Sequence, residues 1–386
     1  MKATFFFDTV LLKDDNQNFF GMTLTYEFIK NRYLQYFDEM TISTREKNKS
    51  QEKGNYTGYK ITNGENVLVK PITEYNNILD SIRKKKKIES QIDKLVKDTD
   101  FVIIRMPSVI GIFACNSAKK YNKQYVIEMV ACPLDGYINH SKKTGVFLAP
   151  IMYYLNKKYI KNAPKVLYVT SKFLQKRYPT YGEEVACSDV DLPKTDIETL
   201  VNRKNKIEEC KYSKILKLAT IASVELKYKG HIYVFKAIAK LKKEGRNIKY
   251  YLAGGGDNSR LKKLASKYGI QDNVVFLGSL THEKVFELID SIDIYVQPSL
   301  QEGLPRALIE AMNRACPAIG SNAGGIPELL CKDFIVKKRN SRAIYKILKN
   351  ITTEQLTKQA EYNYERSKEF EKEKLEEKRR LFYKGS

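Results

Sequence analysis

Short apolar runs rich in valine, isoleucine, phenylalanine and tyrosine alternate with longer stretches of helical character along most of the chain. This alternation is typical of parallel sheets with helices on both faces. The strands predicted in the first half are residues 3–7, 39–43, 66–72, 101–105, 125–130 and 165–171. The strands predicted in a second series are residues 215–222, 248–254, 273–278, 292–299 and 316–321. The pattern therefore predicts an α/β fold built from two strand series.

A polar, charged segment at 188–213 separates the two series and has no sustained apolar periodicity, so we interpret it as the interdomain connection. After about residue 352 the chain reads as one long charged helix. A chain of 386 residues is too long for one ordinary core, so two domains with a cleft between them are expected. The predicted units are a first domain at 1–190, a linker at 191–213, a second domain at 214–352 and a final helix at 353–386.

Composition narrows the class of protein. Hydrophobic residues make up 42% of the chain and charged residues 29%, which argues against a disordered protein. The longest uninterrupted apolar run, 146–155, is about half the ~20 residues that a membrane-spanning helix needs. The first residues read as a buried strand rather than a secretory leader, so a cytoplasmic protein is expected. Six scattered cysteines with no CxxC pair suggest neither a disulfide framework nor a zinc site.

The net charge indicates which kinds of partner the protein could bind. The 68 basic and 45 acidic residues leave a net charge of +23, which attracts nucleic acid, anionic lipid or phosphate-bearing substrates. Segment 81–90 carries five consecutive cations, and segment 144–165 mixes apolar and aromatic residues with lysines. Such segments suit an anionic membrane surface. The alternatives are a solvated helix beside a core helix, or a basic nucleic-acid-binding protein, although no nucleic-acid-binding motif is present.

The stretch PSLQEGLPRALIEAM at 298–312 carries the most specific chemistry. It places Glu302 and Glu310 eight positions apart around a Gly-Leu-Pro turn. Pro305 suits the first turn of a helix, and a helix start preceded by Gly303 offers free N–H groups and a positive dipole end to an anion. An ionised carboxylate accepts two hydrogen bonds and therefore suits paired sugar hydroxyls. The stretch predicts a diphosphate at the helix start with a carbohydrate group on each glutamate.

These motifs resemble the donor-binding half of the retaining glycosyltransferase family 4, which has the GT-B fold. The similarity is carried by FLGSL at 276–280, DIYVQPSLQEGLPRALIEAM at 293–312 and PAIGSNAGGIPELL at 317–330, and it extends back to LATIASVELKYKGH at 218–231. It implies two Rossmann-like domains facing a central cleft, with the final helix crossing back to the first domain. It also implies that Glu302 faces the donor hexose, that Glu310 holds the ribose and that Lys229 binds phosphate.

The resemblance extends to a wider set of expected site residues. The residues expected to bind the donor are Gly21, Ser223, Lys229, Gly278, Leu280, Glu302, Gly303, Leu304, Pro305, Arg306 and Glu310. The family commonly has an arginine where this chain has Ser223-Val224, and Arg306 is a candidate to supply that charge. The family's first-domain histidine is also missing, so Glu128 and Asp135 join Glu302 and Lys229 as expected catalytic residues.

The implied activity is transfer of a hexose from a nucleotide-diphosphate sugar to a saccharide hydroxyl, with retained configuration. UDP is favoured over GDP, and the expected acceptor is lipid-linked, in bacterial surface polysaccharide or glycoconjugate synthesis at the inner face of the plasma membrane. Arg105 is a candidate contact for acceptor or phosphate. Asp189 and Asp191 superficially match a metal-binding DxD motif, but their place in the linker argues against that role. No metal or other cofactor is expected, and a catalytically silent subunit is the alternative.

Overall fold

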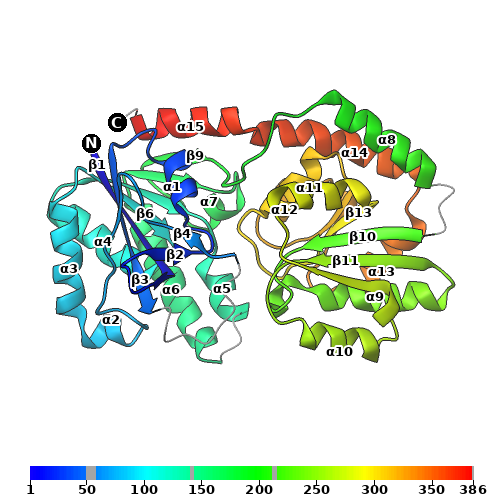
Figure 1. The fold of residues 1–386 in the computed structure, drawn as a ribbon, viewed down its shortest axis with the longest axis horizontal. Helices are drawn as coiled ribbons and strands as arrows, with labels where there is room; N and C mark the ends of the chain where they lie inside the picture. The colour runs from blue at the N-terminus through cyan, green and yellow to red at the C-terminus, as the bar shows by residue number, and fades with distance from the viewer. Residues whose placement is uncertain (49–57, 140–142, 211–214, 385–386) are drawn as a thin grey trace.

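In the computed structural model, which describes residues 1–48, 58–139, 143–210 and 215–384, the chain forms two α/β domains joined along one side by its final helices (Figure 1). Within these residues the first domain holds a nine-stranded sheet with the path β4-β2-β1-β6-β7-β8-β9, and β3 and β5 continue from β1. The second domain holds a six-stranded sheet in the order β12-β11-β10-β13-β14-β15. The predicted α/β architecture of two Rossmann-like domains is confirmed.

The strands of the first domain are β1 (Lys2–Lys13), β2 (Phe19–Gly21), β3 (Glu39–Asn48), β4 (Lys60–Ile61), β5 (Val67–Val69), β6 (Phe101–Met106), β7 (Gln124–Met129), β8 (Lys165–Tyr168) and β9 (Glu183–Ala186). Its helices are α1 (Tyr26–Arg32), α2 (Asp80–Arg83), α3 (Lys85–Lys97), α4 (Val109–Lys120), α5 (Pro133–Asn139), α6 (Lys143–Lys161) and α7 (Phe173–Arg177). Strands β3, β1, β6, β7, β8 and β9 run parallel, so their carboxyl ends meet at one edge, where ligands of such sheets bind.

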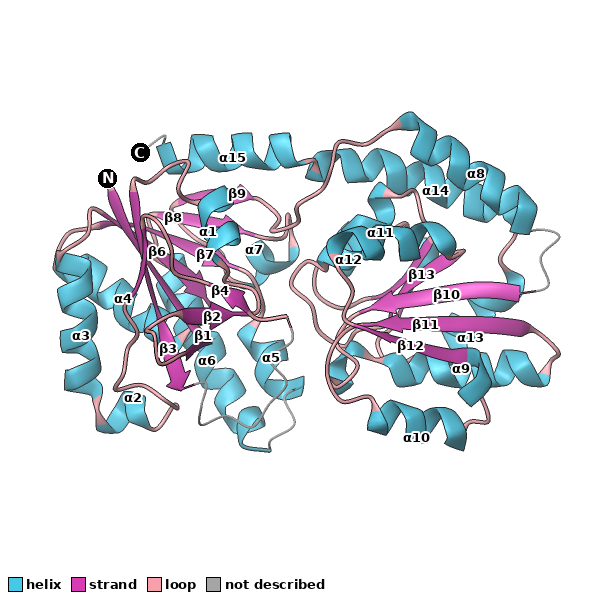
Figure 2. Cartoon of the chain, viewed as in Figure 1, coloured by secondary structure: helices cyan, strands magenta, loops and turns pink. Residues whose placement is uncertain are grey.

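The strands of the second domain are β10 (Ile215–Ile221), β11 (Asn247–Ala253), β12 (Val274–Gly278), β13 (Ile294–Gln297), β14 (Ala318–Ser321) and β15 (Ile335–Val336). The remaining helices are α8 (Ile197–Cys210), α9 (His231–Lys243), α10 (Ser259–Lys267), α11 (His282–Ser291), α12 (Arg306–Asn313), α13 (Ser341–Asn350), α14 (Thr353–Ser367) and α15 (Lys372–Lys384). Helices α11 and α12 cover one face of the parallel sheet, while α9 and α13 cover the other (Figure 2).

The chain after the first strand differs from the prediction. Strand β1 continues to Lys13 past an irregularity in its pairing with β3, and β2 folds back on it as an antiparallel hairpin. Gly21, which we expected to bind the donor, is the last residue of β2. Helix α1 begins later, where the Thr25 hydroxyl accepts a hydrogen bond from the Phe28 N–H at 3.2 Å. The sequence pattern missed this hairpin because Asp8 and Thr9 interrupt the apolar run of β1 and six polar residues at 13–18 follow it.

The predicted linker is largely helical. Residues 197–210 form α8, in which Leu200, Arg203 and Ile207 are buried at helical spacing. The Arg203 guanidinium donates to the carbonyl oxygens of Ile289 and Ile292, at 2.8 and 2.7 Å, so a charged residue occupies an inward position. This buried arginine explains why apolar periodicity missed the helix. Helix α8 packs on α14, and the extended crossing between the domains is confined to residues near 187–196.

The final segment is two helices rather than one. A short turn at Lys368–Phe370 separates α14, which contacts α8 and α12, from α15, which lies along the first domain (Figure 1). Leu375 and Phe382 of α15 are buried, and the Lys165 ammonium donates to the Phe382 carbonyl oxygen at 3.0 Å. The implied return of the final helix to the first domain is therefore present, and the turn lets each half follow its own domain.

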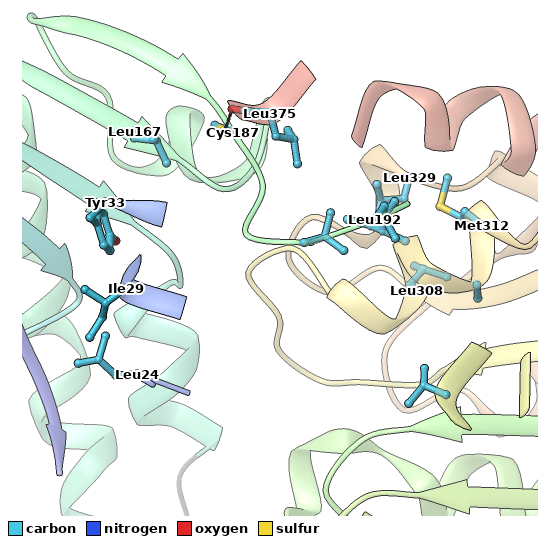
Figure 3. Packing of buried hydrophobic residues seen from close by; sticks show 14 of the residues in the cluster. Leu24, Ile29, Tyr33, Leu167, Cys187, Leu192, Leu308, Met312, Leu329 and Leu375 are labelled. Atoms are coloured by element: carbon cyan, nitrogen blue, oxygen red, sulfur yellow. Dashed lines mark hydrogen bonds between the residues drawn. The ribbon is translucent and has the colours of Figure 1, made fainter. Parts of the chain in front are cut away.

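One buried apolar cluster continues across the domains. Figure 3 shows members of this cluster from the first domain, from the crossing segment and from the second domain. They include Leu24, Ile29, Tyr33, Leu167, Cys187, Leu192, Leu308, Met312, Leu329 and Leu375. The Cys187 thiol also donates to the carbonyl oxygen of Leu375, at 3.5 Å, which links the crossing segment to α15. The connection is thus packed into the core on both sides.

Candidate active site

The loop between β13 and α12 is held in place by neighbouring turns. The Leu300 N–H donates to the Tyr228 carbonyl oxygen at 2.7 Å, and the Gly325 N–H donates to that of Gly303 at 2.8 Å. Helix α12 begins at Arg306, with Pro305 at its N-cap and no side-chain acceptor there. Pro305 therefore lies one position before the helical residue that we expected. The first N–H groups of α12 are left available to an anion.

Two glycines allow the close approaches that shape this loop. Gly230 has a φ of +77°, and a Cβ at that position would lie 2.0 Å from the Pro298 carbonyl oxygen. A Cβ at Gly303 would lie 2.1 Å from the Val130 carbonyl oxygen of the first domain. Gly303 therefore lets the loop touch the opposite domain, in addition to the role at the helix start that we predicted for it.

Glu302 is the centre of a nearly buried polar cluster. Its side chain is 11% exposed, and its Oε1 accepts hydrogen bonds from the Lys229 ammonium at 2.7 Å and from the Gln297 amide at 3.0 Å. Gln297 in turn accepts from the Tyr295 hydroxyl at 2.6 Å and donates to the Ser299 hydroxyl at 3.0 Å. Sequence reasoning found Glu302 and Lys229 but missed Gln297. Its signal is a single amide at the end of an otherwise apolar strand.

Glu310 lies one turn into α12 and has different neighbours. Its side chain is 14% exposed, and its Oε1 is 3.7 Å from Nε2 of His282, the first residue of α11. Hydrogen bonding to Glu310 raises the pKa of His282. The segment that ends β12 and enters α11 contains two predicted donor residues, Gly278 and Leu280, which precede His282 by four and two positions. We did not predict His282, although it directly follows the FLGSLT run.

The loops after β10, β11 and β12 meet at the same edge. The Val224 N–H, next to Ser223, donates to the Gly255 carbonyl oxygen at 3.2 Å, and the Gly254 N–H donates to that of Gly278 at 2.7 Å. The Ser223 carbonyl oxygen also lies 3.1 Å from Nε2 of His231, whose burial lowers its pKa to about 4. A neutral imidazole thus secures the Ser223 loop near neutral pH. The predicted donor residues of the second domain gather at one edge.

Glu128 does not face the cleft, which corrects our expectation. It is fully buried, and its Oε1 accepts from the hydroxyls of Tyr33 at 2.9 Å and Tyr383 at 2.5 Å. Its Oε2 accepts from Arg105 Nη1 at 2.8 Å, and Arg105 and Arg32 both pair with Asp189. Burial and the Glu128 charge raise the pKa of Tyr33, so this hydroxyl stays a donor. Glu128 therefore belongs to a buried charge network that alternating strand positions could not reveal.

The other first-domain candidates lie apart from the donor loop. Asp135, in the first turn of α5, pairs with Arg177 at 3.0 Å and is nearly buried. Gly21 packs within its own domain, where a Cβ would lie 2.8 Å from the Leu24 carbonyl oxygen. Asp191 lies 3.8 Å from the Lys372 ammonium. The structure therefore does not join these three residues to Glu302 and Lys229, and the roles predicted for Asp135 and Gly21 rest on sequence alone.

A cavity of about 240 Å³ lies between the domains. It is lined by Phe5, Phe7, Thr23, Leu24, Phe28, Arg105, Val130, Val169, Asp189, Leu304 and Arg306. The first-domain residues come mainly from β1 and from the carboxyl ends of the parallel strands, whereas Leu304 and Arg306 come from the loop and first turn of α12. The cavity therefore adjoins the Glu302 loop and is built from both domains.

A carboxylate from the second domain also fastens the two halves together. Glu328 accepts hydrogen bonds from the backbone N–H groups of Ser171 at 2.7 Å, Lys172 at 3.1 Å and Phe173 at 2.5 Å, and from the Ser171 hydroxyl at 2.7 Å. These donors form the start of α7, where an acidic group is favoured. The contact is therefore a direct tie between the second domain and the first.

Comparison with known proteins agrees with this arrangement. The family model described as "Glycosyl transferases group 1" matches residues 203–370. Protein CapJ of Staphylococcus aureus is 34% identical over 89% of this chain and 83% of its own length. The putative colanic acid biosynthesis glycosyltransferase WcaL of Escherichia coli is 30% identical over 33% of this chain and 34% of its own.

Solved structures show the same fold at low sequence identity. Sucrose-phosphate synthase from Thermosynechococcus elongatus superimposes with a TM-score of 0.68 at 14% identity, covering 100% of this chain and 98% of that one. Anabaena HepE in complex with UDP has a TM-score of 0.66 at 13% identity and full coverage of both chains. The GT-B fold predicted from the sequence is confirmed. Because the family model matches this chain and CapJ aligns with 89% of it, the chain belongs to the group 1 glycosyltransferase family and is a glycosyltransferase.

Proposed function

We propose that this enzyme transfers a hexose from a UDP-sugar to a hydroxyl of a saccharide acceptor, with retention of the anomeric configuration. The observation that supports this best is the cluster of Lys229, Glu302 and Gln297 next to the open start of α12. Anabaena HepE has been solved with UDP-glucose, which favours a UDP-sugar over a GDP-sugar as the donor here. The nucleotide-sugar is a substrate, and the proposal includes no metal or other cofactor.

Negative charge develops on the leaving diphosphate during such a transfer. The Lys229 ammonium and the free N–H groups of α12 are fixed before the reaction, so they stabilise this charge at little reorganisation cost. Glu302 is restrained by two donors, and we assign it to the hexose hydroxyls. Pairing with Glu302 also keeps the Lys229 side chain directed toward the loop in which the diphosphate would sit.

Glu310 is assigned to the ribose, and we predict that Glu310→Ala weakens UDP binding by about 10- to 100-fold. The estimate corresponds to the loss of hydrogen bonds to a charged group, about 1.5–3 kcal/mol. Titration calorimetry with UDP measures the effect, and the same titration with GDP compares the two nucleotides. Glu287→Ala, an exposed glutamate on α11, is the matched control. Equal UDP affinity of Glu310→Ala and wild type would refute the ribose assignment.

The acceptor is proposed to be a saccharide of a bacterial surface polysaccharide or glycoconjugate, carried on a lipid at the inner face of the plasma membrane. The named role of WcaL in colanic acid synthesis supports the polysaccharide part. Helix α6 supports the membrane part, because Phe147, Ile151 and Tyr154 lie at helical spacing and are 80, 55 and 69% exposed. Among the described residues, the helices are all too short or too polar to span a bilayer.

The lysines near the apolar stripe of Phe147, Ile151 and Tyr154 indicate that α6 is the segment that contacts the lipid. Lys157 and Lys161 follow the apolar stripe on α6. In contrast, part of the cationic run at 83–87 is paired: Lys84 with Glu74 at 3.1 Å and Lys85 with Glu89 at 3.7 Å. We therefore assign membrane contact to α6, where each lysine near anionic headgroups contributes about 1 kcal/mol.

We expect the wild-type protein to float with phosphatidylglycerol vesicles at low salt and the Phe147→Ser/Tyr154→Ser variant to remain behind. The substitutions remove apolar area that is already exposed, so the fold is retained. Ile197→Ser, which changes an exposed residue of α8, is the control and should float like wild type. Flotation of the double variant at the wild-type level would remove α6 from the proposal.

A further inference from the structure

Two arginines, Arg105 and Arg306, and one carboxylate, Asp189, line the cavity between the domains, so its lining carries one more cation than anion. We propose that the acceptor entering this cavity carries an anionic group, a carboxylate or a phosphate ester, which binds between Arg306 and Arg105 while its sugar ring packs on a phenylalanine wall. This inference rests on the proposed function and adds the chemical class of the acceptor.

The wall of the cavity is apolar and fixed. Phe5, Phe7 and Phe28 line it together with aliphatic side chains from both domains. The Arg105 guanidinium lies 5.8 Å from the Phe7 ring centroid, and that of Arg32 lies 5.6 Å from the Phe28 ring centroid. These cation–π contacts restrain both rings. A pocket with such a wall and a few polar groups selects a ligand that has one apolar face and one group to orient it.

The charge network that reaches the cavity through Arg105 and Asp189 contains equal numbers of cations and anions. Two cations, Arg32 and Arg105, face two anions, Glu128 and Asp189. The two oxygens of Asp189 contact Arg32 at 2.7 Å and Arg105, so this carboxylate is already committed to arginines. Arg105 is 14% exposed on its side chain and lines the cavity from a fixed position. Its Nη1 and Nη2 already donate to Glu128 and Asp189, so an anion in the cavity would be met by the N–H groups of this fixed guanidinium that the two carboxylates leave over.

Arg306 is the surplus cation. It is exposed, lines the same cavity from the second domain and forms no ion pair with any residue in the described part of the chain. It is also the first residue of α12, where the helix dipole disfavours a cation. An anion in the cavity would relieve this unfavourable placement and would also meet Arg105 on the opposite wall. The donor diphosphate is the competing source of that anion.

Ligand-observed NMR with three probes tests the proposal: methyl glucuronide, glucose 6-phosphate and neutral methyl glucoside, each measured with and without saturating UDP. We expect at least one anionic probe to bind about tenfold more tightly than the neutral one, as a charged hydrogen bond predicts. The two anionic probes separate a carboxylate from a phosphate. Arg306→Gln should abolish the preference for the anionic probes, both with and without UDP. Arg342→Gln, in the first turn of α13, is the matched control and should retain it.

Two results would overturn the inference. One is equal binding of all three probes to the wild-type protein. The other is weaker UDP binding by Arg306→Gln with the preference for anionic probes intact, which would assign Arg306 to the donor diphosphate. A wild-type protein that binds no UDP contradicts the proposed donor instead, and the measurements without UDP then decide the acceptor class by themselves.

Discussion

Glu302→Ala is expected to lower kcat by about 10²- to 10³-fold, the usual effect of removing one preorganised electrostatic group from an active site. The carboxylate is held by Lys229 and Gln297 and adjoins the open start of α12, so its loss removes the contact assigned to the hexose and frees the lysine. UDP affinity should change much less, because the ribose is assigned to Glu310. The measurement is steady-state transfer or donor hydrolysis with UDP-glucose, combined with UDP titration.

The control for Glu302→Ala is Glu354→Ala, which breaks the exposed ion pair between Glu354 and Lys358 on α14. That pair is far more exposed than the one in the active site, so its loss should leave both turnover and melting temperature unchanged. Glu302→Gln adds a second comparison, because it keeps the shape of the side chain and removes its charge. Wild-type turnover in both Glu302 variants would exclude this residue from the reaction.

Glu128→Ala is expected to destabilise the first domain by about 3–5 kcal/mol, the cost of breaking a buried ion pair. Removing this carboxylate leaves Arg32 and Arg105 buried with only Asp189 to balance them. It also deprives the buried hydroxyls of Tyr33 and Tyr383 of their acceptor. Urea unfolding followed by far-UV circular dichroism measures the loss, because the chain contains no tryptophan.

Glu39→Ala is the matched control for Glu128→Ala. It removes a carboxylate that pairs with Lys2 at the exposed edge of the same domain, and we expect a loss of at most about 1 kcal/mol. Tyr383→Phe removes one donor to Glu128 from the end of α15 and should fall between the two. If Glu128→Ala unfolds at the wild-type urea concentration, the buried network has no structural role.

Helix α15 does not line the cavity, but the buried network around Glu128 connects it to a residue that does. Tyr383 contacts Glu128, Glu128 holds Arg105, and Arg105 lines the cavity between the domains. The end of the chain is therefore connected to the proposed acceptor site through two hydrogen-bonded contacts. Arg379 of the same helix donates to the carbonyl oxygen of Ser188, next to Asp189, and reinforces this connection.

Local patterns predicted the central strands well because strands buried on both faces are nearly continuous apolar runs. FVIIRM at 101–106 and IYVQ at 294–297 are examples. Short edge strands such as β4, with two exposed residues, carry no such signal and were missed. Helix α8 was missed for another reason: its inward face includes Arg203, whose charge is satisfied by carbonyl oxygens far along the chain.

The linear pattern of residues was sufficient for the fold class and the family, and it singled out Glu302, Glu310 and Lys229 as candidates for donor binding. These features depend on local spacing around strand ends and helix starts, which a linear motif records directly. The burial of Glu128, and the position of Arg105 and Arg306 at one cavity although they are 201 residues apart, appear only in the folded chain. Burial and pairing of charges depend on which distant segments meet, and a single sequence does not encode those meetings in any local pattern.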